Sequence, residues 1–140
     1  MPVHPQTEKL IRDVLIGSPV ARALGISLDT VEVDRVVLRL PFSPENVTLG
    51  AIVHGGVIAT LIDVAGAAAS FSGVGPEMRG ATSSLAISYL AAADGTDLVA
   101  EARIIQRGRS QTVAEVVVRS ADGRLVAQAL STNRVFSPPK

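Results

Sequence analysis

The fold of this chain is decided by residues 54–72, whose sequence is HGGVIATLIDVAGAAASFS. Apolar side chains lie on nearly every side of the helix that residues 55–72 would form, and a helix without a polar face is buried inside a protein. Residues 73–76, which include two glycines and a proline, end that helix. Because Asp63 near its middle would be costly in lipid, we expect a buried central helix at about residues 55–72 and no membrane partner.

Strand-like runs flank the central helix on both sides. Recurring Val, Ile, Leu and Ala residues predict two strands before it and four after it. Apolar spacing predicts a short N-terminal helix at residues 6–16, and residues 19–24 form a further helical turn. Short turn sequences separate the last four strands, which favours an antiparallel meander. The expected strands are residues 26–33, 36–42, 81–91, 97–106, 112–120 and 124–136.

One apolar helix and one mainly antiparallel sheet indicate a single α+β domain over residues 1–140. We expect the sheet to curl around the helix, since that is how the helix can be covered. The length of 140 residues is sufficient for one domain with a sizeable core. With aromatic residues at only 3%, that core must consist of small and branched aliphatic side chains.

The composition excludes several classes of function. Thirteen acidic and thirteen basic residues give zero net charge, and few aromatic rings are available for base stacking, so nucleic acid is not an expected partner. The absence of cysteine excludes disulfides, a thiol nucleophile and thiolate metal sites. Residues 1–8 lack the basic stretch and apolar run of a secretion signal, which favours a cytoplasmic protein. No metal-binding or dinucleotide motif is present, so neither a metal nor a cofactor is expected.

Asp63 is the first candidate for chemistry. A carboxylate in so apolar a helix costs several kcal/mol unless it finds hydrogen-bond donors or water. It is therefore either a catalytic base or nucleophile, or a structural carboxylate at a solvated edge.

The helix N-terminus is the second candidate. The first amide N–H groups of a helix have no partner within the helix, and Gly55 and Gly56 would let a ligand approach them closely. Such a donor can stabilise the oxyanion that forms when a carbonyl is attacked. The alternative is that the two glycines only form a tight turn.

These two candidates are too far apart to act together within one chain. Asp63 lies eight residues beyond Gly55, which is roughly 12 Å along a helix. Two antiparallel copies of the helix across a two-fold axis would bring Gly55 of one copy beside Asp63 of the other. If both residues act on one carbonyl, the protein is at least a homodimer.

The spacing of His54-Gly55-Gly56 and Asp63 resembles the HGG…D signature of hotdog-fold acyl-CoA thioesterases, in particular those related to the phenylacetate-pathway enzyme. Further pieces of the chain resemble this family in the same order. They are residues 19–26, 37–41, 86–90, 107–109 and 122–127.

This resemblance implies the hotdog fold and hydrolysis of an acyl-CoA to a free acid and coenzyme A. Asp63 would attack the thioester or activate water, and Gly55 of the partner chain would hold the carbonyl oxygen. His54 would help to shape the site, with a packed or turn-stabilising imidazole as the alternative. Thr82 matches the family's Ser/Thr position seven residues before Tyr89, with Ser83 one register step away. The family often forms homotetramers.

Substrate-binding roles are expected for a second set of residues. Asn46 resembles the family's asparagine upstream of the glycine motif, with a loop-capping role as the alternative. Arg107 and Arg109 flank Gly108 in a turn where guanidinium groups can bind coenzyme A phosphates, unless the turn is simply solvated. Two other functions stay open: a hotdog-fold dehydratase or hydratase that uses His54 with Asp63, and a non-catalytic acyl-CoA-binding protein.

Overall fold

The computed structural model describes residues 1–139. Its elements agree with the expected order of a helix, two strands, the central helix and four strands. The predicted helix 6–16 is α-helical only in its first part and continues with wider, π-helical turns. The elements are α1 (Pro5–Leu10), η1 (Ile11–Ile16), α2 (Pro19–Leu24), β1 (Ser27–Glu32), β2 (Arg35–Leu40), η2 (Pro44–Asn46), α3 (Gly55–Ser72), β3 (Arg79–Tyr89), β4 (Leu98–Arg107), β5 (Gln111–Ser120) and β6 (Leu125–Phe136).

The six strands form one antiparallel sheet in the order β1-β2-β4-β5-β6-β3. Strands β4, β5 and β6 form the expected meander, but its extension to β3 is wrong, because β3 pairs with β6 rather than β4. Both edges of β4 are already occupied, by β2 and β5. Residues 90–97, which contain the predicted Asp94-Gly95 turn, therefore connect the edge strand β3 to the interior strand β4, past β6 and β5.

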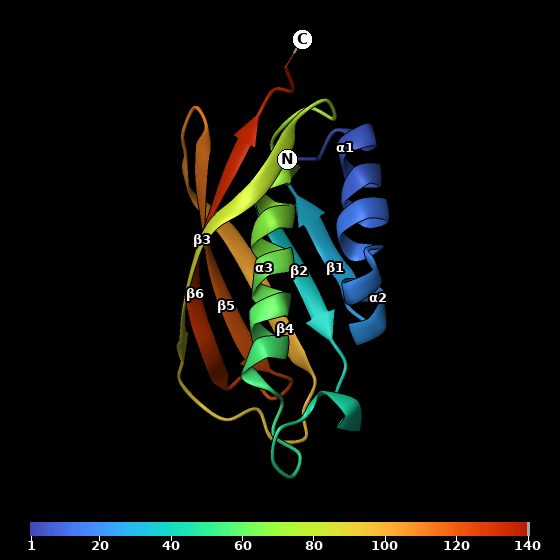
Figure 1. Cartoon of the computed structure of the whole chain (residues 1–140), viewed down its shortest axis with the longest axis vertical. Coiled ribbons are helices and arrows are strands. Elements are labelled where there is room, and N and C mark those ends of the chain that lie inside the picture. Colours follow the sequence, from blue (N-terminus) through green and yellow to red (C-terminus); the bar gives the residue numbers. More distant parts are fainter. Residues whose placement is uncertain (140) are drawn as a thin grey trace.

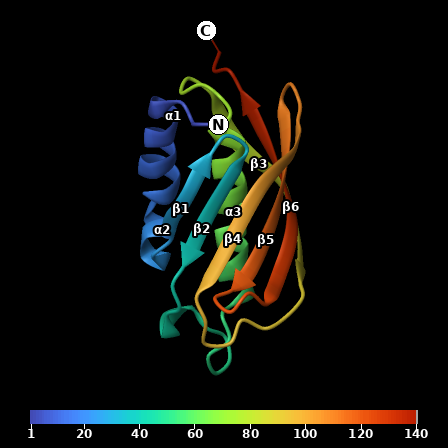
Figure 2. The same cartoon turned by 180° about the vertical axis from the view of Figure 1, so that it is seen from behind.

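The sheet wraps around α3, as Figure 1 shows from the helix side and Figure 2 from behind the sheet. Helices α1 and α2 lie beside β1, so that α3 runs between them on one side and β3 on the other (Figure 1). The predicted α+β architecture, an antiparallel sheet around a long central helix, is confirmed.

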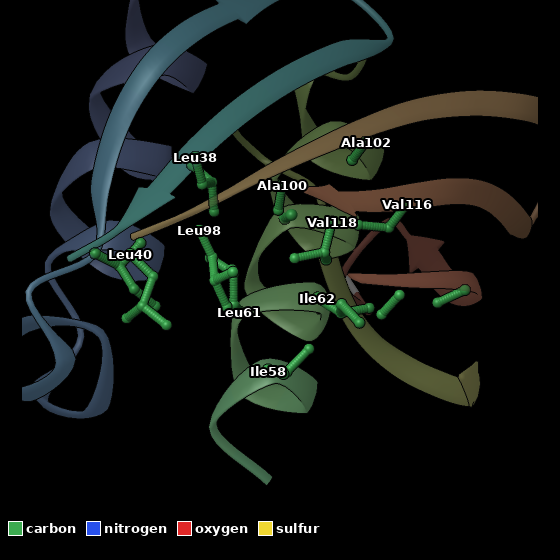
Figure 3. Close-up of a cluster of buried hydrophobic side chains, with 14 of the residues drawn as sticks. Leu38, Leu40, Ile58, Leu61, Ile62, Leu98, Ala100, Ala102, Val116 and Val118 are labelled. Atoms are coloured by element: carbon green, nitrogen blue, oxygen red, sulfur yellow. The ribbon is translucent and has the colours of Figure 1, made fainter. Parts of the chain in front are cut away.

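The core lies between α3 and the concave face of the sheet. Leu61 projects from α3 toward Leu98 of the sheet, and Ile62 lies on the side of Val116 and Val118 (Figure 3). Farther along α3 the contacts are made by small residues. A Cβ at Gly66 would overlap the Ser131 side chain of β6, so this glycine is what lets the helix lie so close to the strand.

The expectation that α3 is enclosed on every side is wrong for the single chain. Nine of its eighteen residues are buried. The helix is long and apolar enough to span a membrane, but it packs on the sheet as a core helix. Its opposite side carries a stripe of half-buried residues at helical spacing, which we call the α3 stripe: Val57, Thr60, Val64, Ala67 and Phe71.

Candidate active site

Asp63 lies on the half-buried side of α3 and faces β3. Its Oδ1 accepts a hydrogen bond of 2.7 Å from the Thr82 hydroxyl. Within residues 1–139, no hydrogen bond to the second carboxylate oxygen, Oδ2, is found. One oxygen of the carboxylate is thus oriented by the protein, and the other is available to water or a substrate.

A β-bulge determines which hydroxyl of the Thr82-Ser83-Ser84 run reaches Asp63. Thr82 pairs with Asn133 of β6, while Ser84 pairs with Thr132, so Ser83 is the extra residue of the bulge. The Ser83 hydroxyl donates to the Thr132 backbone carbonyl at 3.2 Å instead. The sequence left open whether Thr82 or Ser83 contacts Asp63, and this geometry favours Thr82.

Two buried polar residues behind Thr82 were missed by the sequence analysis. Asn133 is 2% exposed, and its Oδ1 lies 3.2 Å from the Thr82 hydroxyl. Its Nδ2 donates to Ser131, which is fully buried. The signal was present in the period-two pattern of β6, where Ala127, Ala129, Ser131, Asn133 and Val135 all point inward.

A cavity of about 230 Å³ lies in front of Asp63. Val14 and Leu15 of η1 form one wall, and Gly80 and Thr82 at the start of β3 form the other. Most of the lining is apolar, and its polar groups come from Asp63, Thr82, Asn133 and Ser18. Such an arrangement is typical of a site that binds an apolar substrate and orients it with a few polar groups.

The N-terminal turn of α3 offers one free amide donor. His54 is the N-cap, and its Nδ1 accepts a hydrogen bond of 2.8 Å from the Gly56 N–H. The Val57 and Ile58 amides bond to the His54 carbonyl. The Gly55 N–H has no hydrogen-bond partner among residues 1–139, so of the two glycines Gly55 is the one able to bind a carbonyl oxygen.

Two neighbours hold this turn in place. The Tyr89 hydroxyl donates to the Gly55 carbonyl at 2.8 Å, and the His54 N–H donates to the Asn46 carbonyl at 2.8 Å. A small loop, closed by a bridge between Val47 and Val53, spans the residues that separate Asn46 from the glycine motif. The structure therefore brings Asn46 next to His54.

The turn borders a separate cavity of about 360 Å³, which Gly55, Tyr89 and Thr48 help to line. Neither of these two cavities is lined by both Gly55 and Asp63. The roughly 12 Å that separates them on the helix is thus maintained in the folded chain. Among residues 1–139, no three His, Asp or Glu side chains are close enough to hold a metal ion.

The predicted phosphate-binding turn lies at the other end of α3. Arg107 bonds to Asp34 at 2.7 Å and to the Ser70 carbonyl at 3.0 Å, so its guanidinium is engaged with the end of the helix. The Gly108 N–H bonds to the Gln111 carbonyl inside the turn. Arg109 is exposed. Phosphate binding stays a prediction for this turn, and at Arg107 it would compete with the helix contacts.

Two relatives with assigned or candidate activities match most of the chain. A protein of Salmonella typhimurium, a medium/long-chain acyl-CoA thioesterase, is 28% identical over 93% of this chain and 94% of its own length. A protein of Halobacterium salinarum, named as a candidate esterase, is 38% identical over 71% of this chain and 69% of its own length.

Solved structures share the fold. A thioesterase family protein from Silicibacter pomeroyi superimposes with a TM-score of 0.89 at 27% identity, over 94% of this chain and 99% of that one. A Streptococcus mutans protein bound to acetyl CoA gives a TM-score of 0.74 at 25% identity, over 83% and 92%. Residues 50–127, more than half of the chain, match the Thioesterase superfamily. Fold, relatives and this match agree, and the chain belongs to the thioesterase superfamily with the hotdog fold.

Proposed function

We propose that this protein hydrolyses acyl-CoA thioesters, with Asp63 as the catalytic carboxylate. The observation that carries the proposal is the contact between Asp63 and Thr82, because it leaves an oriented carboxylate with one free oxygen at the wall of an apolar cavity. Acyl-CoA is the substrate class because a relative is an acyl-CoA thioesterase and a similar structure binds acetyl CoA. The glycine motif further favours the phenylacetate-pathway subgroup.

The chemistry needs an attacking oxygen and an oxyanion donor. Asp63 either attacks the thioester carbonyl or removes a proton from an attacking water, which Thr82 helps to position. A new C–O bond forms, to water or to the Asp63 carboxylate, the C–S bond breaks, and coenzyme A leaves as the thiol after taking up a proton. If Asp63 is the attacking group, water then hydrolyses the resulting anhydride, which releases the acid and restores the carboxylate. The Gly55 N–H binds the carbonyl oxygen while it carries negative charge.

We propose that a second copy of the chain supplies this donor. β3 is an edge strand of eleven residues and carries no charged side chain between Arg79 and Tyr89. Long uncharged edges are uncommon in proteins that stay unpaired, because they invite another strand. The α3 stripe lies next to this edge. Antiparallel pairing of two chains through β3 and the first part of the stripe, Val57 and Thr60, would place Gly55 of one near Asp63 of the other.

Further association into a homotetramer and a cytoplasmic location stay predictions. Analytical ultracentrifugation tests the first directly, since a dimer and a tetramer differ twofold in mass. A monomer at micromolar concentration would contradict the shared site.

The primary test is thiol release from a panel of acyl-CoA esters by the wild type and by Asp63→Asn. We expect kcat to fall by about a hundred- to ten-thousandfold with the variant, the usual range for a positioned acid or base. Its unfolding transition should change little, because Asn can still accept the Thr82 hydrogen bond. Equal turnover by both proteins would rule out Asp63 as the catalytic group.

A mixing experiment tests the shared site. Chains carrying Asp63→Asn and chains carrying Gly55→Pro are each inactive in the proposal, but a mixed dimer contains one intact site. Exchange of subunits should restore up to about a quarter of the wild-type activity, by random pairing. No recovery after proven exchange would contradict the model.

The two other functions receive no support from a specific contact. A dehydratase would use His54 of one chain with Asp63 of the other, and turnover of a 3-hydroxyacyl or enoyl thioester without release of the thiol would identify it. A purely binding protein would retain its ligand affinity in Asp63→Asn and show no turnover before or after the change.

A further inference from the structure

A third cavity, of about 410 Å³, lies where the N-terminal helix faces the end of α3. Leu10, Pro76 and Met78 help to line it, and its surface is mainly apolar. It has four lining residues in common with the cavity in front of Asp63: Val14, Leu15, Phe71 and Gly80. The two spaces are therefore neighbours along α3 and have common walls.

Two large apolar side chains around this third cavity are not buried in the core. Leu10 is 42% and Val14 is 58% exposed, although both are large and apolar. Val14 belongs to η1, whose six residues are π-helical. Such widened turns are rare and frequently occur at functional sites. An apolar occupant would remove these side chains from water.

We infer that the two cavities form one channel for the acyl group, and that it accepts straight chains of medium length. The inference rests on the proposed function, because Asp63 marks where the thioester carbonyl lies. The channel begins there and ends in the third cavity, which Phe71 borders on the α3 side and Leu10 on the side of the N-terminal helix.

In the proposed dimer this channel lies outside the contact between the two copies of α3. If Gly55 of one α3 lies opposite Asp63 of the other, the two-fold axis passes near Ala59. The partner's helix then begins at the level of Asp63, and residues 64–72 extend beyond it. The groove from Asp63 to Phe71 is thus not covered by the partner's α3, and the coenzyme A portion must leave in another direction.

The length of the channel sets the substrate class. Phe71 lies eight residues beyond Asp63, which is roughly 12 Å along the helix. With C–C bonds of about 1.5 Å in a zigzag, an extended chain advances about 1.25 Å per carbon, so about ten carbons reach Phe71. A short acyl group or an arylacetyl group would leave the far cavity empty.

Binding of S-alkyl-CoA thioethers tests the channel without requiring hydrolysis. We expect the affinity of the wild type to rise about fourfold per methylene from butyl to decyl and then to level off. In parallel, kcat/KM is measured for butanoyl-, decanoyl- and phenylacetyl-CoA, and decanoyl-CoA should be the best substrate of the three.

A substitution at the far end gives a matched comparison. Leu10→Trp fills the cavity that only the longer chains reach, so the ratio of kcat/KM for decanoyl- over butanoyl-CoA should fall at least tenfold. The control is Ile105→Trp, since Ile105 is also an exposed apolar residue, at 56%, but lies on β4 outside all three cavities. It should leave the ratio unchanged.

The outcomes separate the two proposals. Affinity that rises with chain length in the absence of any turnover supports the channel and rules out hydrolysis. Turnover without dependence on chain length, or with phenylacetyl-CoA preferred, overturns the channel and leaves hydrolysis standing. An unchanged ratio in folded Leu10→Trp also overturns the channel.

Discussion

The two ends of α3 differ in how they are held. At the N-terminal end, the exposed His54 caps the helix, Tyr89 supports it from β3, and the Gly55 N–H has no partner among the described residues. At the C-terminal end, the helix carbonyls bond to Arg107, and the Ser72 hydroxyl accepts a hydrogen bond from the Asp34 amide. One end is left accessible and the other is fixed by several contacts.

The C-terminal end joins three parts of the chain. Arg107 comes from the end of β4, and Asp34 from the turn between β1 and β2, where it adopts a left-handed φ of 68°. Gly73 leaves room for this ion pair, since a Cβ there would lie 2.9 Å from the Arg107 guanidinium. A cation is also favourable at this end of the helix dipole. The C-terminal end of α3 thus contributes to stability, and the N-terminal end is suited to binding.

Among changes at the two ends of α3, the largest effect should come from removing the free amide with Gly55→Pro. Proline has no N–H but is well tolerated at the first position of a helix. His54, with φ −61° and ψ 135°, already has the extended conformation that a residue before proline prefers. We expect kcat for acyl-CoA hydrolysis to fall by about a hundred- to a thousandfold, as for loss of one oxyanion donor, without loss of stability.

The control for this change is Gly55→Ala, which keeps the N–H. A Cβ at this position would lie 3.5 Å from the Tyr89 ring, an ordinary contact. Steady-state kinetics and thermal unfolding of both variants make the comparison. If alanine lowers kcat as much as proline does, then the N–H is not the important group at this end of the helix.

The opposite result is expected for Arg107→Ala. This change removes the bonds to Asp34 and to the Ser70 carbonyl, and we expect the free energy of unfolding to fall by about 2 kcal/mol. Since both side chains are partly exposed, the loss should shrink in high salt. The activity of the folded protein should stay within a few-fold of the wild type.

Arg109→Ala provides the matched comparison in the same turn. Arg109 is exposed, so the free energy of unfolding should change by no more than about 0.5 kcal/mol. If the turn binds coenzyme A phosphates, this variant raises KM in a salt-dependent manner. If KM rises in Arg107→Ala but not in Arg109→Ala, then Arg107, which also caps the helix, is the residue that contacts the phosphates.

The sequence predicted the elements better than their pairing. The bounds of α3 were correct because glycines stand at both of its ends and apolar residues fill the interval. The position of β3 was not, since alternation within a strand says nothing about which neighbour it pairs with. For the same reason, an apolar surface on all sides of α3 did not reveal that one side stays uncovered in the single chain.

The site shows the same limit. The spacing between Gly55 and Asp63 follows from helix geometry and was readable. The contact between Thr82 and Asp63 depends on a bulge, and the one between Arg107 and Asp34 joins residues 73 positions apart. Contacts of this kind are set by strand order and register, which the sequence does not reveal. The basic turn was therefore predicted only as a phosphate site, whereas its Arg107 also caps the C-terminal end of α3.

The smallest effect should come from Tyr89→Phe, which tests how firmly the N-terminal end of α3 is held. The variant keeps the ring against Gly55 and removes only the hydrogen bond to the Gly55 carbonyl. Because Tyr89 is 52% exposed and water can replace its hydroxyl, we expect the free energy of unfolding to fall by only about 0.5 kcal/mol. The first turn of α3 also carries the donor, so kcat should fall a few-fold, less than in Gly55→Pro.

Hydrogen exchange of the Val57 and Ile58 amides should quicken, while exchange near Ser72 stays unchanged. If Tyr89→Phe instead lowered the free energy of unfolding as much as Arg107→Ala does, both ends of the helix would be held equally firmly. The Gly55 N–H would then be free because of the local backbone geometry, and not because this end of the helix is attached more weakly.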